Sequence, residues 1–284
     1  VKVDNYKVYK DLSYGNHERN VLDLWISNSK INSPLMIYIH GGGFGSGSKE
    51  SAYRKNNFNR IKKFIENGIS FATINYRFKN NDDGILISLN DAKRALQFLR
   101  HKSDQFRIDK SKIGVMGSSA GATSSLWLGF FDDMAQPNSN DPIERESTRV
   151  SLVVGIAAAH TMDLNKWKRM LNIEQDYMDK LVSQYIGKLD RKKWMDKTLQ
   201  NEYISKIDFF DEMDQNDPPF FIVNYGGNRK PKDIADFHHH PMHAKILKHR
   251  GDSLKIKNVV YATGIGIIDK SSQGLNAFII EYLK

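Results

Sequence analysis

Gly117-Ser118-Ser119-Ala120-Gly121 is the stretch that decides the fold of this chain. It matches the pattern G-x-S-x-G and directly follows the short apolar run 113–116. A strand that turns sharply into a helix is the context in which this pattern exposes a serine hydroxyl. The two glycines leave room for the turn, because a side chain there would clash with the neighbouring strand or helix. The pattern predicts a nucleophilic Ser119, with negative charge stabilised by the helix N-terminus behind it.

A second glycine-rich stretch, His40-Gly41-Gly42-Gly43-Phe44, ends an apolar segment further upstream. Consecutive glycines allow backbone N–H groups to face a site without obstruction, which is how an oxyanion hole is built. A glycine run alone would also fit a phosphate-binding loop. Here Ser48 separates Gly47 from Lys49, which breaks the Gly-Lys adjacency of a Walker motif. We therefore interpret the stretch as an oxyanion loop.

The rest of the chain alternates short apolar segments with helical patterns, which favours an α/β fold with a mainly parallel sheet. We expect strands at 6–12, 21–27, 34–40, 69–76, 113–116, 151–159, 219–225 and 256–262, and helices at 51–67, 89–101, 120–131, 243–250 and 271–283. Residues 164–210 have helical patterns and no strand signal. They predict a helical cap inserted into a single domain that spans 1–284.

Composition excludes several kinds of site. The chain has no cysteine, so disulfides, thiolate metal sites and a cysteine nucleophile are excluded. The net charge of +9 comes from scattered lysines and arginines rather than a tight basic stripe, so we expect a solvated surface and no nucleic-acid partner. No apolar run approaches the roughly 20 residues of a membrane span. No signal-peptide pattern is present at Val1, and the compartment and oligomeric state stay open.

On these motifs the chain resembles the α/β-hydrolase superfamily, and in particular the carboxylesterases with an HGGG loop that are related to hormone-sensitive lipase and to bacterial feruloyl and acetyl esterases. The matching residues are His40–Phe44, Asn75-Tyr76-Arg77, Asp91, Asp109 and Gly117–Gly121. The resemblance implies an α/β-hydrolase fold with Ser119 as nucleophile and no cofactor. It also implies that the N–H groups of Gly42, Gly43 and Ala120 hold the oxyanion.

The resemblance fails at the two partners that the serine needs. The acid usually follows the strand that ends here at Tyr225, yet the first carboxylate after that strand is Asp233. The histidine usually lies in a Gly-His loop after the last strand, where this chain has Gly264-Ile265. Isoleucine cannot accept the serine proton, and no histidine follows His249.

Three interpretations of the missing histidine stay open. In the first, the base comes from the cluster His238, His239, His240 and His243; we predict His239 with Asp233 as its acid. His160, paired with Asp163, is the other source of a base. In the second, hydrolysis proceeds slowly without a complete triad. In the third, the site binds a small ligand without turnover.

Four clustered histidines could also bind a transition metal. We do not predict a metal site, because Pro241 at the start of a helix makes the ring directions diverge. Side chains of the predicted cap either line an acyl pocket or simply pack the cap; these are Trp167, Met170, Tyr177, Met178 and Trp194. The predicted function is a serine carboxylesterase for small esters, with acyl groups on carbohydrates as one substrate class.

Overall fold

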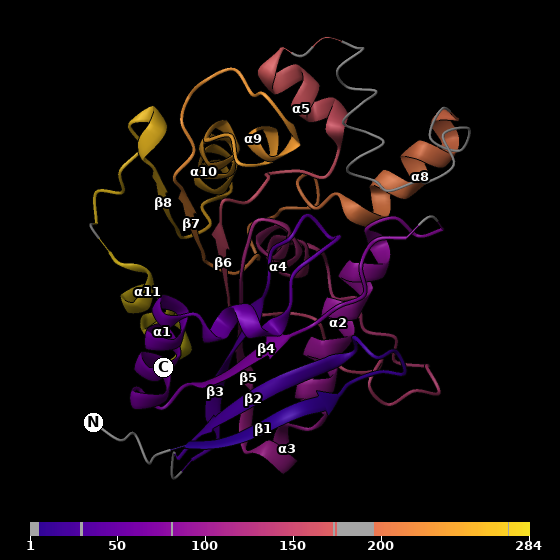
Figure 1. The fold of residues 1–284 in the computed structure, drawn as a ribbon, viewed down its shortest axis with the longest axis vertical. Helices are drawn as coiled ribbons and strands as arrows, with labels where there is room; N and C mark the ends of the chain where they lie inside the picture. The colour runs from indigo at the N-terminus through magenta and orange to yellow at the C-terminus, as the bar shows by residue number, and fades with distance from the viewer. Residues whose placement is uncertain (1–5, 29–30, 81, 173, 175–195, 272) are drawn as a thin grey trace.

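The computed structural model describes residues 1–284 except 1–5, 29–30, 81, 173, 175–195 and 272 (Figure 1). Its strands form one eight-stranded sheet of order β1-β2-β4-β3-β5-β6-β7-β8. The strands are β1 Tyr6–Ser13, β2 Val21–Ser27, β3 Ser33–Ile39, β4 Ser70–Ile74, β5 Ile108–Ser118, β6 Leu152–Ile156, β7 Phe220–Asn224 and β8 Asn258–Ala262. The pairs β1–β2 and β2–β4 are antiparallel, and all other neighbours are parallel.

Strand β3 shows how the sheet divides the core into two layers. Leu35, Ile37 and Ile39 point into the larger core, whereas Met36 and Tyr38 point into the core on the opposite face. The larger core is covered by α2 Leu86–His101, α4 Ala120–Phe130 and α10 Met242–Leu254. Helices α1 Lys55–Glu66 and α11 Leu275–Leu283 cover the other face and lie side by side (Figure 1). The predicted α/β architecture with a mainly parallel sheet is confirmed.

Several element boundaries differ from the prediction. Helix α2 begins at Leu86, so Asp91 lies in its second turn. The helix predicted at 51–67 is divided into the 3-10 helix η1 Lys49–Tyr53 and α1. Two further short elements, α3 Ser103–Phe106 and η2 Thr263–Ile265, lie in connections. Residues 234–238, which have no predicted element, form the helix α9 Ile234–His238.

The predicted cap region contains α5 Leu164–Leu171 and α8 Lys197–Ile207 at its two ends. Tyr177, Met178 and Trp194 lie outside the described residues. Trp167 is fully buried, and its indole N–H donates to the carbonyl of Thr161 at 2.9 Å. Among the described residues, no helix is both long and apolar enough to cross a bilayer.

Candidate active site

Ser119 lies in a sharp turn between β5 and α4. Its backbone has φ 53° and ψ −122°, a conformation that costs a non-glycine residue free energy. Its N–H donates to the carbonyl of Ile156 on β6 at 2.8 Å. A Cβ on Gly117 would come within 2.3 Å of the Gly121 backbone, and one on Gly121 within 2.1 Å of the Ile39 carbonyl oxygen. The two glycines therefore allow the chain to turn against β3 with the serine at the tip.

The hydroxyl of Ser119 meets an imidazole at this tip. Ser119 Oγ and His239 Nε2 lie 2.8 Å apart. His239 is the residue that ends α9, and its N–H donates to the Ala235 carbonyl at 2.9 Å. The structure thus brings together two residues that are far apart in the sequence. For Nε2 to accept the serine proton, the neutral ring must carry its own proton on Nδ1.

The end of β7 holds the backbone around His239. Gly226 packs against it so closely that a Cβ there would lie 2.2 Å from the His239 carbonyl oxygen. The side chain of Asn224 joins the two segments, since its oxygen accepts from the Gly226 N–H at 2.7 Å and its amide donates to the His240 carbonyl at 3.5 Å. Sequence reasoning missed this contact. The adjacent glycines at 226 and 227 were the only signal for it.

The predicted acid, Asp233, is the N-cap of α9. Its carboxylate accepts from the Asp236 N–H at 2.8 Å. The carboxylate of Asp236 accepts in turn from the Arg229 guanidinium at 3.1 Å and from the Lys232 N–H at 3.2 Å. Among the described residues, neither carboxylate forms a hydrogen bond with His239. In the described part of the chain, the structure therefore brings Ser119 and His239 together without a hydrogen-bonded acid.

Both carboxylates still act on His239 through space. Burial lowers the pKa of the His239 ring, and the negative charges of Asp236 and, more weakly, Asp233 oppose this shift and raise it. A lowered pKa keeps the ring neutral at neutral pH. His239 is thus available as a proton acceptor.

The glycine loop lies beside this pair. Gly42 and Gly43 have φ of 125° and 60°, and a Cβ on Gly42 would come within 2.0 Å of the Ser46 carbonyl oxygen. Gly41 packs against Ser118 and Ser119, since a Cβ there would lie 3.3 Å from Ser119 Cβ. Among the described residues, no acceptor binds the backbone N–H groups of Gly42, Gly43 or Ala120. The assignment of these three donors to an oxyanion hole stays a prediction.

His40 shapes the start of this loop. Its Nδ1 lies 2.7 Å from the Gly41 carbonyl oxygen, and its ring stacks on Tyr76 with centroids 4.3 Å apart. Burial lowers the pKa of His40 to about 4, so the ring is neutral. Gly47 passes close to it, because a Cβ there would lie 2.6 Å from His40 Nδ1. The structure gives His40 a role in packing the loop.

The other histidines of the cluster have different partners. His238 Nε2 lies 3.4 Å from the Thr123 hydroxyl, and His240 Nδ1 accepts from the Met242 N–H at 3.3 Å. His243 contacts His160 instead, with their Nδ1 atoms 2.7 Å apart. His160 therefore faces His243 and not the serine, and Asp163 is the N-cap of α5. In the described part of the chain, no three histidines and carboxylates are grouped to hold a metal ion.

Ile265 and Lys49 both have structural roles. Ile265, which stands where relatives have the histidine, packs against the larger core. Lys49 of the near-Walker stretch has a side chain only 4% exposed, and its ammonium pairs with Asp11, Asp23 and Glu50 at 2.8–3.0 Å. A lysine held by three carboxylates cannot serve a phosphate.

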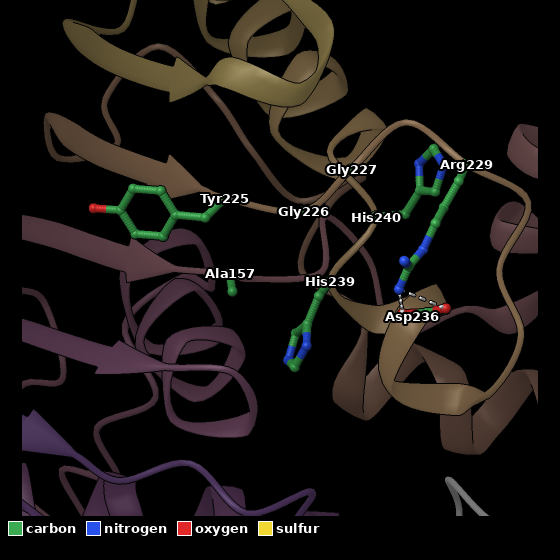
Figure 2. Close-up of a pocket in the computed structure, with 8 residues that line it drawn as sticks. All are labelled: Ala157, Tyr225, Gly226, Gly227, Arg229, Asp236, His239 and His240. Atoms are coloured by element: carbon green, nitrogen blue, oxygen red, sulfur yellow. Dashed lines mark hydrogen bonds and ion pairs between the residues drawn. The ribbon is translucent and has the colours of Figure 1, made fainter.

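A pocket of about 370 Å³ opens on the side of His239 (Figure 2). Figure 2 shows Arg229 and Asp236 joined by their ion pair and the exposed Tyr225 ring pointing away from them. Arg229 is 64% exposed along its side chain, so it is open to solvent as well as paired with Asp236. The pocket is lined by Ala157, Tyr225, Gly226, Gly227, Arg229, Asp236, His239 and His240.

Comparison with solved structures shows that several esterases share this fold. A truncated carbohydrate esterase from gut microbiota superposes with a TM-score of 0.66 at 18% identity, covering 91% of this chain and 87% of that one. The acetyl ester-xyloside bifunctional hydrolase from Caldicellulosiruptor lactoaceticus gives a TM-score of 0.57 at 20% identity, covering 84% and 75%.

Curated relatives match a shorter part of the chain. The probable isoprenylcysteine alpha-carbonyl methylesterase ICMEL2 of Arabidopsis thaliana is 24% identical over 158 residues, which is 55% of this chain and 36% of the relative. The bile salt-activated lipase of Mus musculus is 27% identical over 151 residues, 44% of this chain and 24% of the lipase. The chain thus spans about a quarter to a third of the length of these relatives.

The family model described as BD-FAE matches residues 22–229, which is well over half of the chain. This range includes the glycine loop and the serine turn and ends before His239. On this match, the chain belongs to the BD-FAE family of α/β-hydrolase esterases.

Proposed function

We propose that this protein hydrolyses small carboxylic esters through an acyl-enzyme on Ser119, with His239 as general base. The observation that carries the proposal is the 2.8 Å contact between Ser119 Oγ and His239 Nε2 at the tip of a strained turn. A nucleophile and a base within hydrogen-bond reach are the minimal geometry for activating a serine. Family membership and the esterase neighbours support the same reaction.

The proposed reaction has two halves. His239 Nε2 takes the Ser119 proton as Oγ attacks the ester carbonyl, and the N–H groups of Gly42, Gly43 and Ala120 receive the oxyanion. The imidazolium then gives its proton to the leaving alcohol oxygen, which leaves the acyl group on Ser119. In the second half, water loses a proton to His239, attacks the acyl carbon and releases the carboxylic acid.

The carboxylates of α9 support His239 in this scheme without touching it. Asp233 caps the helix that carries the base, and Asp233 and Asp236 stabilise the imidazolium by their charge. Removing a hydrogen-bonded triad acid lowers kcat by about 10⁴-fold in a well-studied protease. We propose that catalysis here depends less on its acids, because the stabilisation acts over a longer distance.

Two solved esterase structures that share this fold suggest the substrate class. A carbohydrate esterase and an acetyl ester-xyloside hydrolase have this fold, so acyl groups on carbohydrates are the substrates we propose. The pocket beside His239 supports a polar alcohol portion, because an arginine, an aspartate and two glycines contribute to its wall.

The test is hydrolysis of p-nitrophenyl acetate and butyrate by the purified protein beside Ser119→Ala. We expect turnover in the wild type and a loss of at least about 10³-fold in the variant, since Ser119 is the only hydroxyl among the described residues that contacts His239 Nε2. A matched control is Ser118→Ala, which removes a neighbouring hydroxyl that does not contact the base. Equal rates in wild type and Ser119→Ala would contradict the proposal.

A second candidate function is ligand binding without efficient turnover. Two observations favour it: the loop after β8 has Ile265 where relatives have histidine, and no described carboxylate hydrogen-bonds His239. This alternative predicts that acetate or butyrate esters bind, seen by calorimetry, while wild type and Ser119→Ala hydrolyse them at the same negligible rate.

A further inference from the structure

We propose that the buried ring pair of His160 and His243 positions His239 for catalysis, and does so only while both rings are neutral. The inference rests on the proposed role of His239. The pair occupies the space beneath α9, between the loop after β6 and the start of α10. Neither ring contacts Ser119, so their role would be to hold the base in place rather than to exchange its proton.

The hydrogen bonds define the state of each ring. His243 Nε2 lies 2.9 Å from the carbonyl oxygen of Phe237, and a carbonyl only accepts, so Nε2 carries a proton. In a neutral ring, His243 Nδ1 is then an acceptor. It faces His160 Nδ1 at 2.7 Å and the His160 backbone N–H at 3.3 Å. His160 is therefore protonated on Nδ1 and donates to His243.

This arrangement connects β6 to the base. Phe237 lies two positions before His239 in the last turn of α9, so the carbonyl that His243 binds belongs to the turn that presents His239. The loop after β6 holds the other end through His160. Trp167 packs edge-on against the His243 ring, with centroids 5.0 Å apart, and closes the cluster from α5.

Protonation of either ring would destabilise the pair. A second proton on His243 would sit on Nδ1 and place two N–H groups against each other, and a second proton on His160 would sit on Nε2 and leave a charge in a site that is 0–3% exposed. Burial lowers the pKa of His160 to about 3 and that of His243 well below its usual value. The groups that act on them from neighbouring elements are Lys166 of α5 and the histidines 239 and 240, none of which stabilises an imidazolium.

Two substitutions at His160 separate positioning from mere packing. Asn places its amide nitrogen where His has Nδ1, and it can turn its carbonyl toward a protonated His243, so His160→Asn keeps the contact at every pH. Leu cannot donate. We expect His160→Asn to retain kcat within about threefold at pH 8, and His160→Leu to lose about tenfold or more in kcat with KM little changed. His249→Asn, on the exposed side of α10, is the matched control.

The decrease of kcat at acidic pH gives a second measurement of the proposed role of the ring pair. In wild type we expect kcat to fall more steeply than one proton allows at the low-pH end, where the buried ring pair is protonated as well as His239. In His160→Asn it should fall with the slope of a single proton. A wild-type kcat and pH profile in His160→Leu would overturn the proposal.

The tautomers provide a test that needs no activity. Nitrogen-15 spectra of histidine side chains should show His160 protonated on Nδ1 and His243 on Nε2 at pH 8. A proton on His243 Nδ1 would overturn the proposal even if His160→Leu failed to fold. This result is independent of the Ser119→Ala assay, so failure of the esterase proposal and failure of the ring pair are distinguishable.

Discussion

Ser119 combines backbone strain with a partner that comes from an unexpected part of the chain. Its positive φ exposes the hydroxyl at the sheet edge, where the parallel strands β5, β6 and β7 all end. The segment after β7 brings His239 Nε2 to 2.8 Å from Ser119 Oγ, whereas the sequence resemblance places the histidine after the last strand.

The pH dependence should identify which carboxylate supports His239. Asp236 and Asp233 raise the pKa of His239, so Asp236→Asn removes an opposing charge and lowers that pKa further. The acid limb of kcat/KM should therefore move to lower pH, while kcat at pH 8 falls by less than about tenfold, because no hydrogen bond to the ring is lost. Asp233→Asn, which keeps an N-cap side chain, should shift the limb less. A limb that moves to higher pH in Asp236→Asn would contradict this account.

The residues of the serine turn and of the glycine loop could be predicted from sequence because their signals are local. Glycines at fixed positions, a strand before and a helix after are properties of a few adjacent residues. His239 could be only one of several candidates, since its role depends on contacts between β7, α9 and α4. The cap residues 175–195 stay a prediction, because they lie outside the described residues.

At the scale of elements, α9 depends on the end of β7. Helix α9 is only five residues long, too short to be stable alone, so tertiary contacts must hold it. Sequence patterns did not predict α9, because a five-residue helix is too short to show a helical periodicity. The contacts that hold it are those of Asn224, Gly226 and His243.

Gly226→Ala tests this dependence. Its Cβ would lie 2.2 Å from the His239 carbonyl oxygen, which is backbone and cannot rotate away. We expect the turn to shift, with kcat for p-nitrophenyl butyrate falling at least about tenfold through misplacement of the base. The neighbouring Gly227→Ala is the matched control, because a Cβ there meets nothing within 4 Å. Similar kcat values for the two variants would show that this contact is not needed.

For the whole molecule, buried neutral histidines make stability sensitive to acid. His40, His160, His238 and His243 are at most 5% exposed, and burial lowers the pKa of each below the unfolded value. The unfolded chain therefore binds more protons below about pH 6.5, and stability falls as the pH decreases. Asp217, whose pKa burial raises to about 7, opposes this trend.

Each of these histidines changes the free energy of unfolding by up to about 1.4 kcal/mol per pH unit, so the four, opposed by Asp217, together contribute up to about 4 kcal/mol per pH unit. Urea unfolding at pH 7, 6 and 5 should show a midpoint that falls progressively. In His160→Asn the decrease should be smaller, because one titrating ring is gone. A midpoint that is constant from pH 7 to 5 would contradict the assignment of these rings as neutral.

The central claim is that Ser119 and His239 act as one unit, and a double-mutant cycle on kcat/KM tests it most directly. Ser119→Ala, His239→Asn and the double variant should be assayed with p-nitrophenyl butyrate at pH 8. Groups that act together are strongly non-additive, so we predict that each single variant loses about 10³-fold or more and that the double variant loses no more than either. Retention of wild-type activity within threefold in His239→Asn would show that another group serves Ser119.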